Sequence, residues 1–97
     1  MKFTERIIPL REERHIPQRQ FAAAMEIDTA TYCKIEKSER RAKAGQIVVI
    51  AELLQTDKEK LLALWLADQV AEVVEKDKEI SDKTLNIVKQ NINKNRI

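Results

Sequence analysis

The stretch between Gln18 and Glu36 holds the side chains best suited to contacts with another molecule. Two short amphipathic patterns of helical spacing meet at a corner marked by Asp28. The second pattern keeps Tyr32 and Ile35 on its apolar side, and its other side carries small or cationic residues: Thr29, Ala30, Thr31, Cys33 and Lys34. A short helix with this outer face suits the DNA major groove, where Thr and Ala can meet thymine methyl groups and Lys can donate to guanine. The pattern therefore predicts reading of duplex DNA.

Positive charge is distributed unevenly along the chain, whose net charge is only +2. Residues 1–43 hold ten Lys/Arg against seven Asp/Glu (+3), residues 44–79 four against eight (−4), and residues 80–97 four against one (+3). Phosphate binding needs cations at the contact itself, because it acts through local release of counterions. The densest basic segment predicts such contacts from four side chains: Lys37, Arg40, Arg41 and Lys43. Judged by charge alone, an ordinary solvated loop is an equal alternative.

Composition favours one all-helical domain. The 97 residues include one Gly and two Pro, which leaves little turn material. The single Cys excludes an internal disulfide and fits a reducing compartment. The longest apolar run, residues 61–67, is too short to span a bilayer, and residues 1–13 lack the apolar region of a signal peptide. We therefore expect a cytoplasmic protein.

The sequence offers no pattern typical of an enzyme. One His and one Cys do not make a zinc site, and no Gly-rich phosphate loop is present. The carboxylates are scattered among basic residues. We expect no catalytic residues, no metal and no cofactor.

Periodicity and capping residues predict six helices. Pro9 lacks an amide hydrogen and is tolerated in a first turn, so the first helix is expected to start near Ile8 and residues 1–7 to form an arm. Asp28 is expected to cap the third helix, and Thr56 or Asp57 the fifth, where Thr56 and Glu59 match a capping box. The six expected ranges are about 8–15, 18–25, 29–37, 44–54, 58–75 and from 82 onward.

Residues 8–64 resemble the phage-repressor/Cro-like, or Xre-type, helix-turn-helix family. The matching segments are 10–14 (LREER), 18–22 (QRQFA), 27–36 (IDTATYCKIE) and 50–54 (IAELL). The resemblance implies a compact five-helix DNA-binding domain, here followed by a C-terminal helical extension. We place helices one to four in residues 1–57, and the long fifth helix that completes the core, with the last helix, in residues 58–97.

The resemblance also assigns roles to individual residues. Thr29, Ala30 and Lys34 match base-contacting positions, and Gln18 and Thr31 match positions that contact the DNA backbone. The family pattern further implies an ion pair between Arg11 and Glu36, whose carboxylate needs compensation at the end of a helix.

Three departures from the family concern local geometry. Glu26 stands where the family usually has Gly in the turn, at a cost of roughly 1 kcal/mol if its φ is positive. Ser38 stands where Gly commonly follows the third helix. The start of the fourth helix, around Lys43, lacks the usual Ser or Thr cap.

The C-terminal part carries more apolar residues than one core-facing stripe requires. This surplus predicts a homodimer that pairs two recognition helices on a pseudo-palindromic DNA site. The interface is expected to contain Leu61, Trp65, Leu66, Val70, Val73, Leu85, Val88 and Ile92. The alternative is a protein-interaction module, such as an antitoxin whose C-terminal helices bind a different protein.

Overall fold

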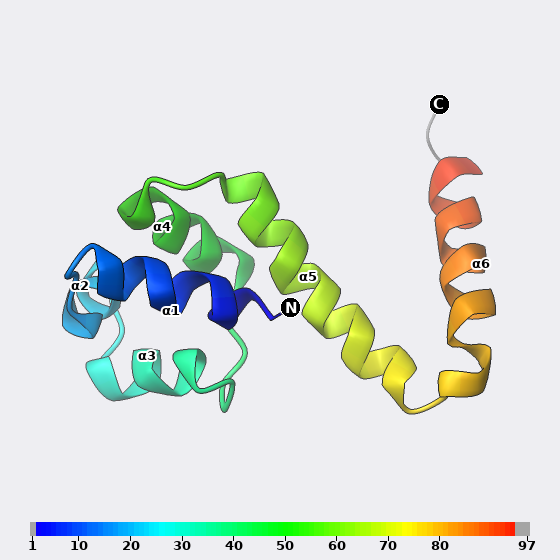
Figure 1. Ribbon diagram of the computed structural model, residues 1–97, viewed down its shortest axis with the longest axis horizontal. Helices are drawn as coiled ribbons and strands as arrows, with labels where there is room; N and C mark the ends of the chain where they lie inside the picture. The colour runs from blue at the N-terminus through cyan, green and yellow to red at the C-terminus, as the bar shows by residue number, and fades with distance from the viewer. Residues whose placement is uncertain (1, 95–97) are drawn as a thin grey trace.

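The computed structural model describes residues 2–94, and Figure 1 shows a body of packed helices with one helix standing apart as an arm. The helices are α1 (Phe3–Glu13), α2 (Gln18–Ala24), α3 (Thr29–Glu36), α4 (Ala44–Leu54), α5 (Lys58–Glu75), a short 3₁₀ helix η1 (Lys78–Ile80) and α6 (Ser81–Lys94). Residues 2–94 contain no strand, so the all-α prediction is confirmed. None of the helices in this range is both long and apolar enough to cross a membrane.

The hydrophobic core lies where α1 to α4 meet the first turn of α5. The rings of Phe21 and Tyr32 stack in it with their centroids 5.4 Å apart. Its buried apolar residues are Phe3, Ile7, Phe21, Ala22, Tyr32, Ile35, Ala42, Ile47, Ile50, Ala51, Leu54 and Leu61. Among the residues whose burial is described, none after Leu61 is fully buried. The rest of α5 leaves the body and leads to α6 (Figure 1).

The expected start of α1 near Ile8, with an arm before it, is wrong. The helix begins at Phe3, and Pro9 lies inside it. Phe3 and Ile7 are buried in the core, and the backbone N–H of Phe3 donates to Asp68 Oδ2 of α5 at 2.9 Å. This burial and this cap from a distant helix stabilise the first turns, although Pro9 cannot donate the usual hydrogen bond.

The other helix boundaries lie close to those expected from the sequence. The bounds of α4 agree with the expected range, and α5 ends at Glu75 as expected. Asp28 caps α3 as predicted, since its carboxylate accepts from the N–H of Thr31 at 2.7 Å. Asp57 rather than Thr56 caps α5, accepting from the N–H groups of its second and third residues. At α4, the backbone N–H of Lys43 donates to the side chain of Gln46, which partly replaces the missing Ser or Thr cap.

Four helices end on a residue with positive φ, and none of these residues is glycine. They are His15, Glu26, Ser38 and Gln55, with φ between 52° and 62°. At each end the next N–H reaches back to the carbonyl five residues earlier, as Ile27 N–H does to Ala22 O at 3.0 Å, which is the Schellman arrangement. A residue with a Cβ is strained in this conformation by roughly 1 kcal/mol. Glu26 and Ser38, two of the departures from the family, both have positive φ, and Glu26 is the position at which a strained turn was expected.

We expect Glu26→Gly to raise the free energy of unfolding by about 0.5–1 kcal/mol. Glycine relieves the strain at positive φ, while its greater freedom in the unfolded chain offsets part of the gain. The measurement is the urea midpoint of each protein. Glu26→Ala is the matched control, because it removes the same charge but keeps the Cβ. Equal midpoints for Glu26→Gly and Glu26→Ala would contradict the strain argument.

Tyr32 brings a polar group into the core. Its side chain is fully buried, and its hydroxyl has no hydrogen-bond partner among the described residues. Burial, and next the neighbouring Glu36 carboxylate, raises the pKa of Tyr32 above its ordinary value. The folded protein therefore strongly favours the neutral phenol.

Tyr32→Phe is expected to raise the free energy of unfolding at neutral pH by about 1 kcal/mol, because it removes a buried hydroxyl without a partner. Since the pKa of Tyr32 is raised in the folded state, its contribution is constant below the ordinary value of 10.0. Above that pH the unfolded chain loses the proton first, so stability falls as the pH rises. Urea unfolding of both proteins from pH 7 to pH 11 should show a smaller alkaline loss for Tyr32→Phe. Parallel losses would contradict this assignment.

Candidate nucleic-acid interface

The helices α2 and α3 form a helix-turn-helix unit in which one side of α3 faces away from the core. Phe21 of α2 stacks on Tyr32 of α3, and the positive φ of Glu26 turns the chain between the two helices. Because Tyr32 and Ile35 are buried, the opposite side of α3 faces outward. Its predicted base-contacting residues Thr29, Ala30 and Lys34 are all exposed there, and Thr31 and Cys33 are half-buried at its edges.

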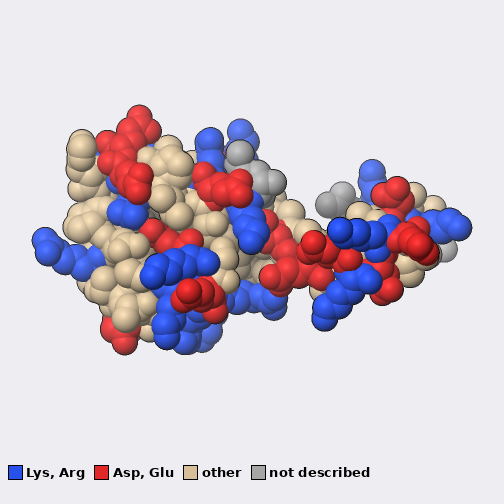
Figure 2. All heavy atoms as spheres, turned by 60° about the horizontal axis from the view of Figure 1, so that its bottom comes forward, with Lys and Arg blue, Asp and Glu red and all other residues tan. Residues whose placement is uncertain are grey.

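Two cations lie near the start of α3. The hydrogen bonds from the Thr31 side chain and N–H lower the pKa of the Asp28 carboxyl, and the charges of Lys34 and Arg40 lower it further. Figure 2 shows Lys and Arg side chains on the body with Asp and Glu side chains among them, and a further group of acidic side chains where the body joins the arm.

Glu36, the last residue of α3, is buried and binds two side chains from other helices. Arg11 Nε donates to Glu36 Oε2 at 2.8 Å, and Arg11 Nη2 donates to Oε1 at 3.0 Å. Gln18 Nε2 donates to the same Oε1 at 3.0 Å. The hydrogen bond to Glu36 raises the pKa of Arg11, which stays charged. The predicted pair of Arg11 and Glu36 thus lies together, and it links α1 and α2 to the end of α3.

Gln18 faces this network instead of the outer surface. Its Nε2 donates to Glu36, and its Oε1 accepts from Cys33 Sγ at 3.1 Å. Its side-chain amide is thus engaged within the protein, and its contact with a phosphate stays a prediction. Gln18 helps to fix the orientation of α3, and the half-buried Cys33 thiol is part of the same contact. No local pattern points to this link, because Gln18 and Cys33 are fifteen positions apart on different helices.

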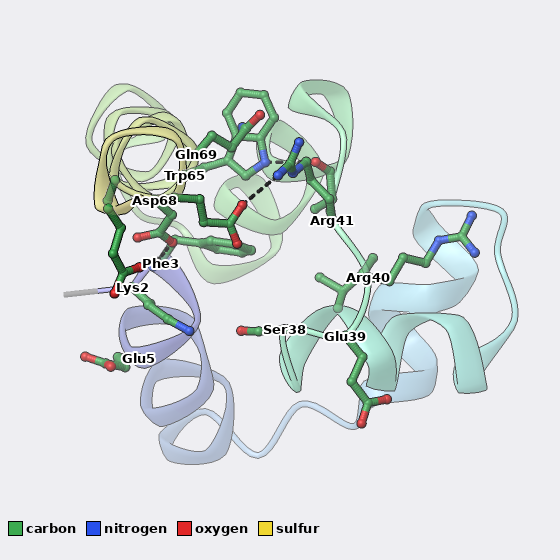
Figure 3. A pocket seen from close by; sticks show the side chains of 15 residues that line it. Lys2, Phe3, Glu5, Ser38, Glu39, Arg40, Arg41, Trp65, Asp68 and Gln69 are labelled. Atoms are coloured by element: carbon green, nitrogen blue, oxygen red, sulfur yellow. Dashed lines mark hydrogen bonds and ion pairs between the residues drawn. The ribbon is translucent and has the colours of Figure 1, made fainter. Parts of the chain in front are cut away.

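The four loop cations do not point in one direction. Figure 3 shows Arg40 extending away from Arg41, which turns toward α5. There Arg41 Nη2 donates to Glu72 Oε2 at 2.7 Å, with both side chains more than 60% exposed. Lys37, Arg40 and Lys43 are also exposed. The prediction that Arg41 binds phosphate is therefore weakened, because its guanidinium is already paired with a carboxylate on α5.

A groove of about 660 Å³ separates the start of α1, the α3–α4 loop and the middle of α5 (Figure 3). Phe3 and Trp65 supply apolar lining, and Gln69 Nε2 is buried there without a hydrogen-bond partner among residues 2–94. Its charged lining residues are more often acidic than basic: Glu5, Glu39, Asp68, Glu72 and Glu75 against Lys2, Arg40 and Arg41. Within residues 2–94, no three His, Cys, Asp or Glu side chains come together as a metal ion would require.

The predicted dimer residues divide into two groups. Placing Leu61 in the interface is wrong, because its side chain is 2% exposed and belongs to the core. Trp65 makes its main contacts within its own chain, since it packs against the core and its Nε1 donates to Ala42 O at 2.8 Å. The other six side chains are exposed: Leu66, Val70, Val73, Leu85, Val88 and Ile92.

Comparison with known proteins gives one match that covers more than half of the chain. A sequence model of the helix-turn-helix domain matches residues 10–61, which is 52 of the 97 residues. No curated protein and no solved structure matches the chain. The matched residues run from within α1 to the first buried residue of α5, and they contain the whole α2–α3 unit. The chain belongs to the Xre/Cro-like helix-turn-helix family of DNA-binding regulatory domains.

Proposed function

We propose that this protein is a sequence-specific transcriptional regulator, acting as a repressor or autoregulator in the cytoplasm. The observation that carries the proposal is the two-sided character of α3. Tyr32 and Ile35 hold this helix in the core, while Thr29, Ala30 and Lys34 are exposed on its outer side. A helix held in this way can enter the major groove without losing contact with its own domain.

The side chains of α3 and of the loop after it make two kinds of contact, with bases and with phosphates. Lys34 donates to guanine O6 or N7, whereas Thr29 and Ala30 make short apolar contacts with thymine methyl groups. Thr31 and the exposed cations Lys37, Arg40 and Lys43 contact phosphates, which set position and orientation. Arg41 joins them only when its exposed pair with Glu72 opens.

We further propose that two copies bind one pseudo-palindromic operator. A single α3 contacts few base pairs, and a two-fold dimer doubles the site that is read. Seven large apolar side chains on α5 and α6 are between 40% and 74% exposed, which favours a further contact of this region with a protein surface. This surface lies on the arm side, away from α2 and α3 (Figure 1).

Selection of bound fragments from a random DNA pool tests this function. We expect enrichment of a motif with two inverted half-sites. The triple variant Thr29→Gly, Ala30→Gly, Lys34→Ala should lose the motif. Arg41→Ala is the matched control, because it removes a cation outside the outward face of α3 and should keep the same motif. No enrichment with the wild type at low salt would contradict the proposal.

The second candidate is a module that binds a different protein, as an antitoxin does. The observation that favours it is the same exposed apolar surface on α5 and α6. Light scattering on the pure protein separates the two candidates. A dimer supports use of this surface between copies, whereas a monomer that selects no DNA motif supports the protein-interaction module.

A further inference from the structure

The second half of α5 has an apolar face that its own domain does not cover. Leu66, Val70 and Val73 follow the spacing i, i+4 and i+7, and their side chains are 55%, 40% and 74% exposed. They lie on the side of the helix away from Leu61, which enters the core. The small or branched residues beside them are also apolar: Ala63, Ala67 and Val74. We call this surface the outer face of α5.

A second uncovered apolar surface lies on α6. Leu85, Val88 and Ile92 follow the spacing i, i+3 and i+7 and are 40%, 47% and 52% exposed. We call these three residues the α6 stripe. At a rise of 1.5 Å per residue, the stripe is roughly 10 Å long and the outer face of α5 roughly 16 Å. The stripe therefore fits along the outer face within its length.

The two surfaces do not cover each other within one chain. Figure 1 shows α6 diverging from α5 after the turn at residues 76–80. Both surfaces are exposed as a result, including residues of α5 close to the turn such as Val73. Within one chain, the α6 stripe and the outer face of α5 are thus both uncovered. Two copies can cover both surfaces if each places its α6 on the α5 of the other, as in domain swapping.

Charge also favours contact between these segments. Residues 57–79 hold four Lys against seven Asp/Glu, a balance of −3, and residues 80–94 hold three Lys against one Asp, a balance of +2. The arm of one copy thus brings positive charge to an acidic segment of the other. Two α5 helices packed directly against each other would instead bring together segments of like charge.

We propose that the occupant of the outer face of α5 is the α6 stripe of a second copy of this chain, and that the contact is reciprocal. Each dimer then contains two equivalent contacts between α5 of one protomer and α6 of its partner. This arrangement specifies the interface of the dimer that the proposed function requires. It depends on the proposed function only because both require a dimer. Its test needs no DNA.

Light scattering at micromolar concentration gives the first measurement. We expect the wild type at twice the monomer mass of 11.3 kDa. Val73→Glu on α5 and Val88→Lys on α6 should each reduce the mass to that of the monomer, because each places a charge in both contacts. Ile87→Lys is the matched control. Ile87 is 57% exposed, lies about 100° around the helix from Val88, and its substitution should leave the dimer intact.

Mixing the two monomeric variants gives the decisive measurement. In a mixed dimer, one contact pairs Glu at position 73 with Lys at position 88, and the other contact is entirely wild type. We therefore expect the mixture to recover the dimer mass. Direct packing of α5 on α5, or of α6 on α6, predicts no recovery, and that result would overturn the exchange while leaving a dimer in place. A monomeric wild type would overturn it too, whereas DNA selection by that protein would still report on the proposed function. Unchanged circular dichroism of each variant shows that its helices are retained.

Discussion

Replacing Glu36 with alanine is expected to lower the free energy of unfolding by about 3 kcal/mol. The substitution leaves the Arg11 guanidinium, whose side chain is 14% exposed, without its carboxylate partner. It also removes the acceptor for Gln18 Nε2, so three helices lose their shared contact. The value lies at the lower end of the range for buried pairs, because Arg11 keeps some contact with water. Urea unfolding at neutral pH measures the loss.

The chain contains a matched surface pair that serves as the control. Arg41 and Glu72 are 2.7 Å apart, close to the 2.8 Å between Arg11 and Glu36, but their side chains are 62% and 68% exposed. Arg41→Ala should therefore change the free energy of unfolding by less than about 1 kcal/mol. The double variant Arg11→Met, Glu36→Leu should lose less free energy of unfolding than Arg11→Met and Glu36→Leu lose in sum as single variants. In the double variant no charge is left buried without its partner. Equal small losses for Glu36→Ala and Arg41→Ala would contradict the role assigned to burial.

Lys34→Ala should produce the largest loss of DNA specificity, about 1–3 kcal/mol for the cognate site. Lys34 is the long cationic side chain on the outward face of α3, whereas Thr29 and Ala30 are short. Its loss should relax the preference at one or two base positions and leave binding to scrambled DNA much less affected. Titrations with cognate and scrambled duplexes measure the difference.

Two arginines of the α3–α4 loop provide the comparison for Lys34. Arg40→Ala should weaken binding to all sequences about equally and reduce the log–log salt slope by about one unit, as for one lost phosphate contact. Arg41→Ala should have a smaller effect on the slope, because its guanidinium is paired with Glu72. A loss for Lys34→Ala that is the same on cognate and scrambled DNA would show that Lys34 contacts phosphate instead of bases.

The parts of the fold that local residues determine were predictable from the sequence. The cap by Asp28 follows from a side chain at the helix end, and the bounds of α4 follow from the helical spacing of its apolar residues. The strained turn at Glu26 was predictable because the family pattern reserves this position for glycine. The outward face of α3 followed from the helical spacing of Tyr32 and Ile35, which had to be buried.

The features that sequence reasoning missed depend on contacts between distant segments. The start of α1 needs Asp68, which lies 65 positions away and accepts the N–H of Phe3. Gln18 was assigned to DNA from its family position, and Arg41 from its positive charge. Neither kind of evidence reveals that a side chain has a partner within the protein. Glu36 receives the amide of Gln18, and Glu72 receives the guanidinium of Arg41. Counting apolar residues on α5 likewise did not separate Leu61, which enters the core, from the exposed outer face.

The four helix ends without glycine affect how readily this protein can evolve new DNA preferences. Strain of roughly 1 kcal/mol at each end consumes an appreciable share of the 5–15 kcal/mol that holds a typical domain folded. Substitutions on α3 that change base preference are tolerated only while enough stability is left, because most substitutions destabilise. A background with glycine at Glu26, Ser38 and Gln55 would therefore accept a wider range of recognition-helix sequences. In this family member, we expect the strained helix ends to limit which operators its descendants can reach.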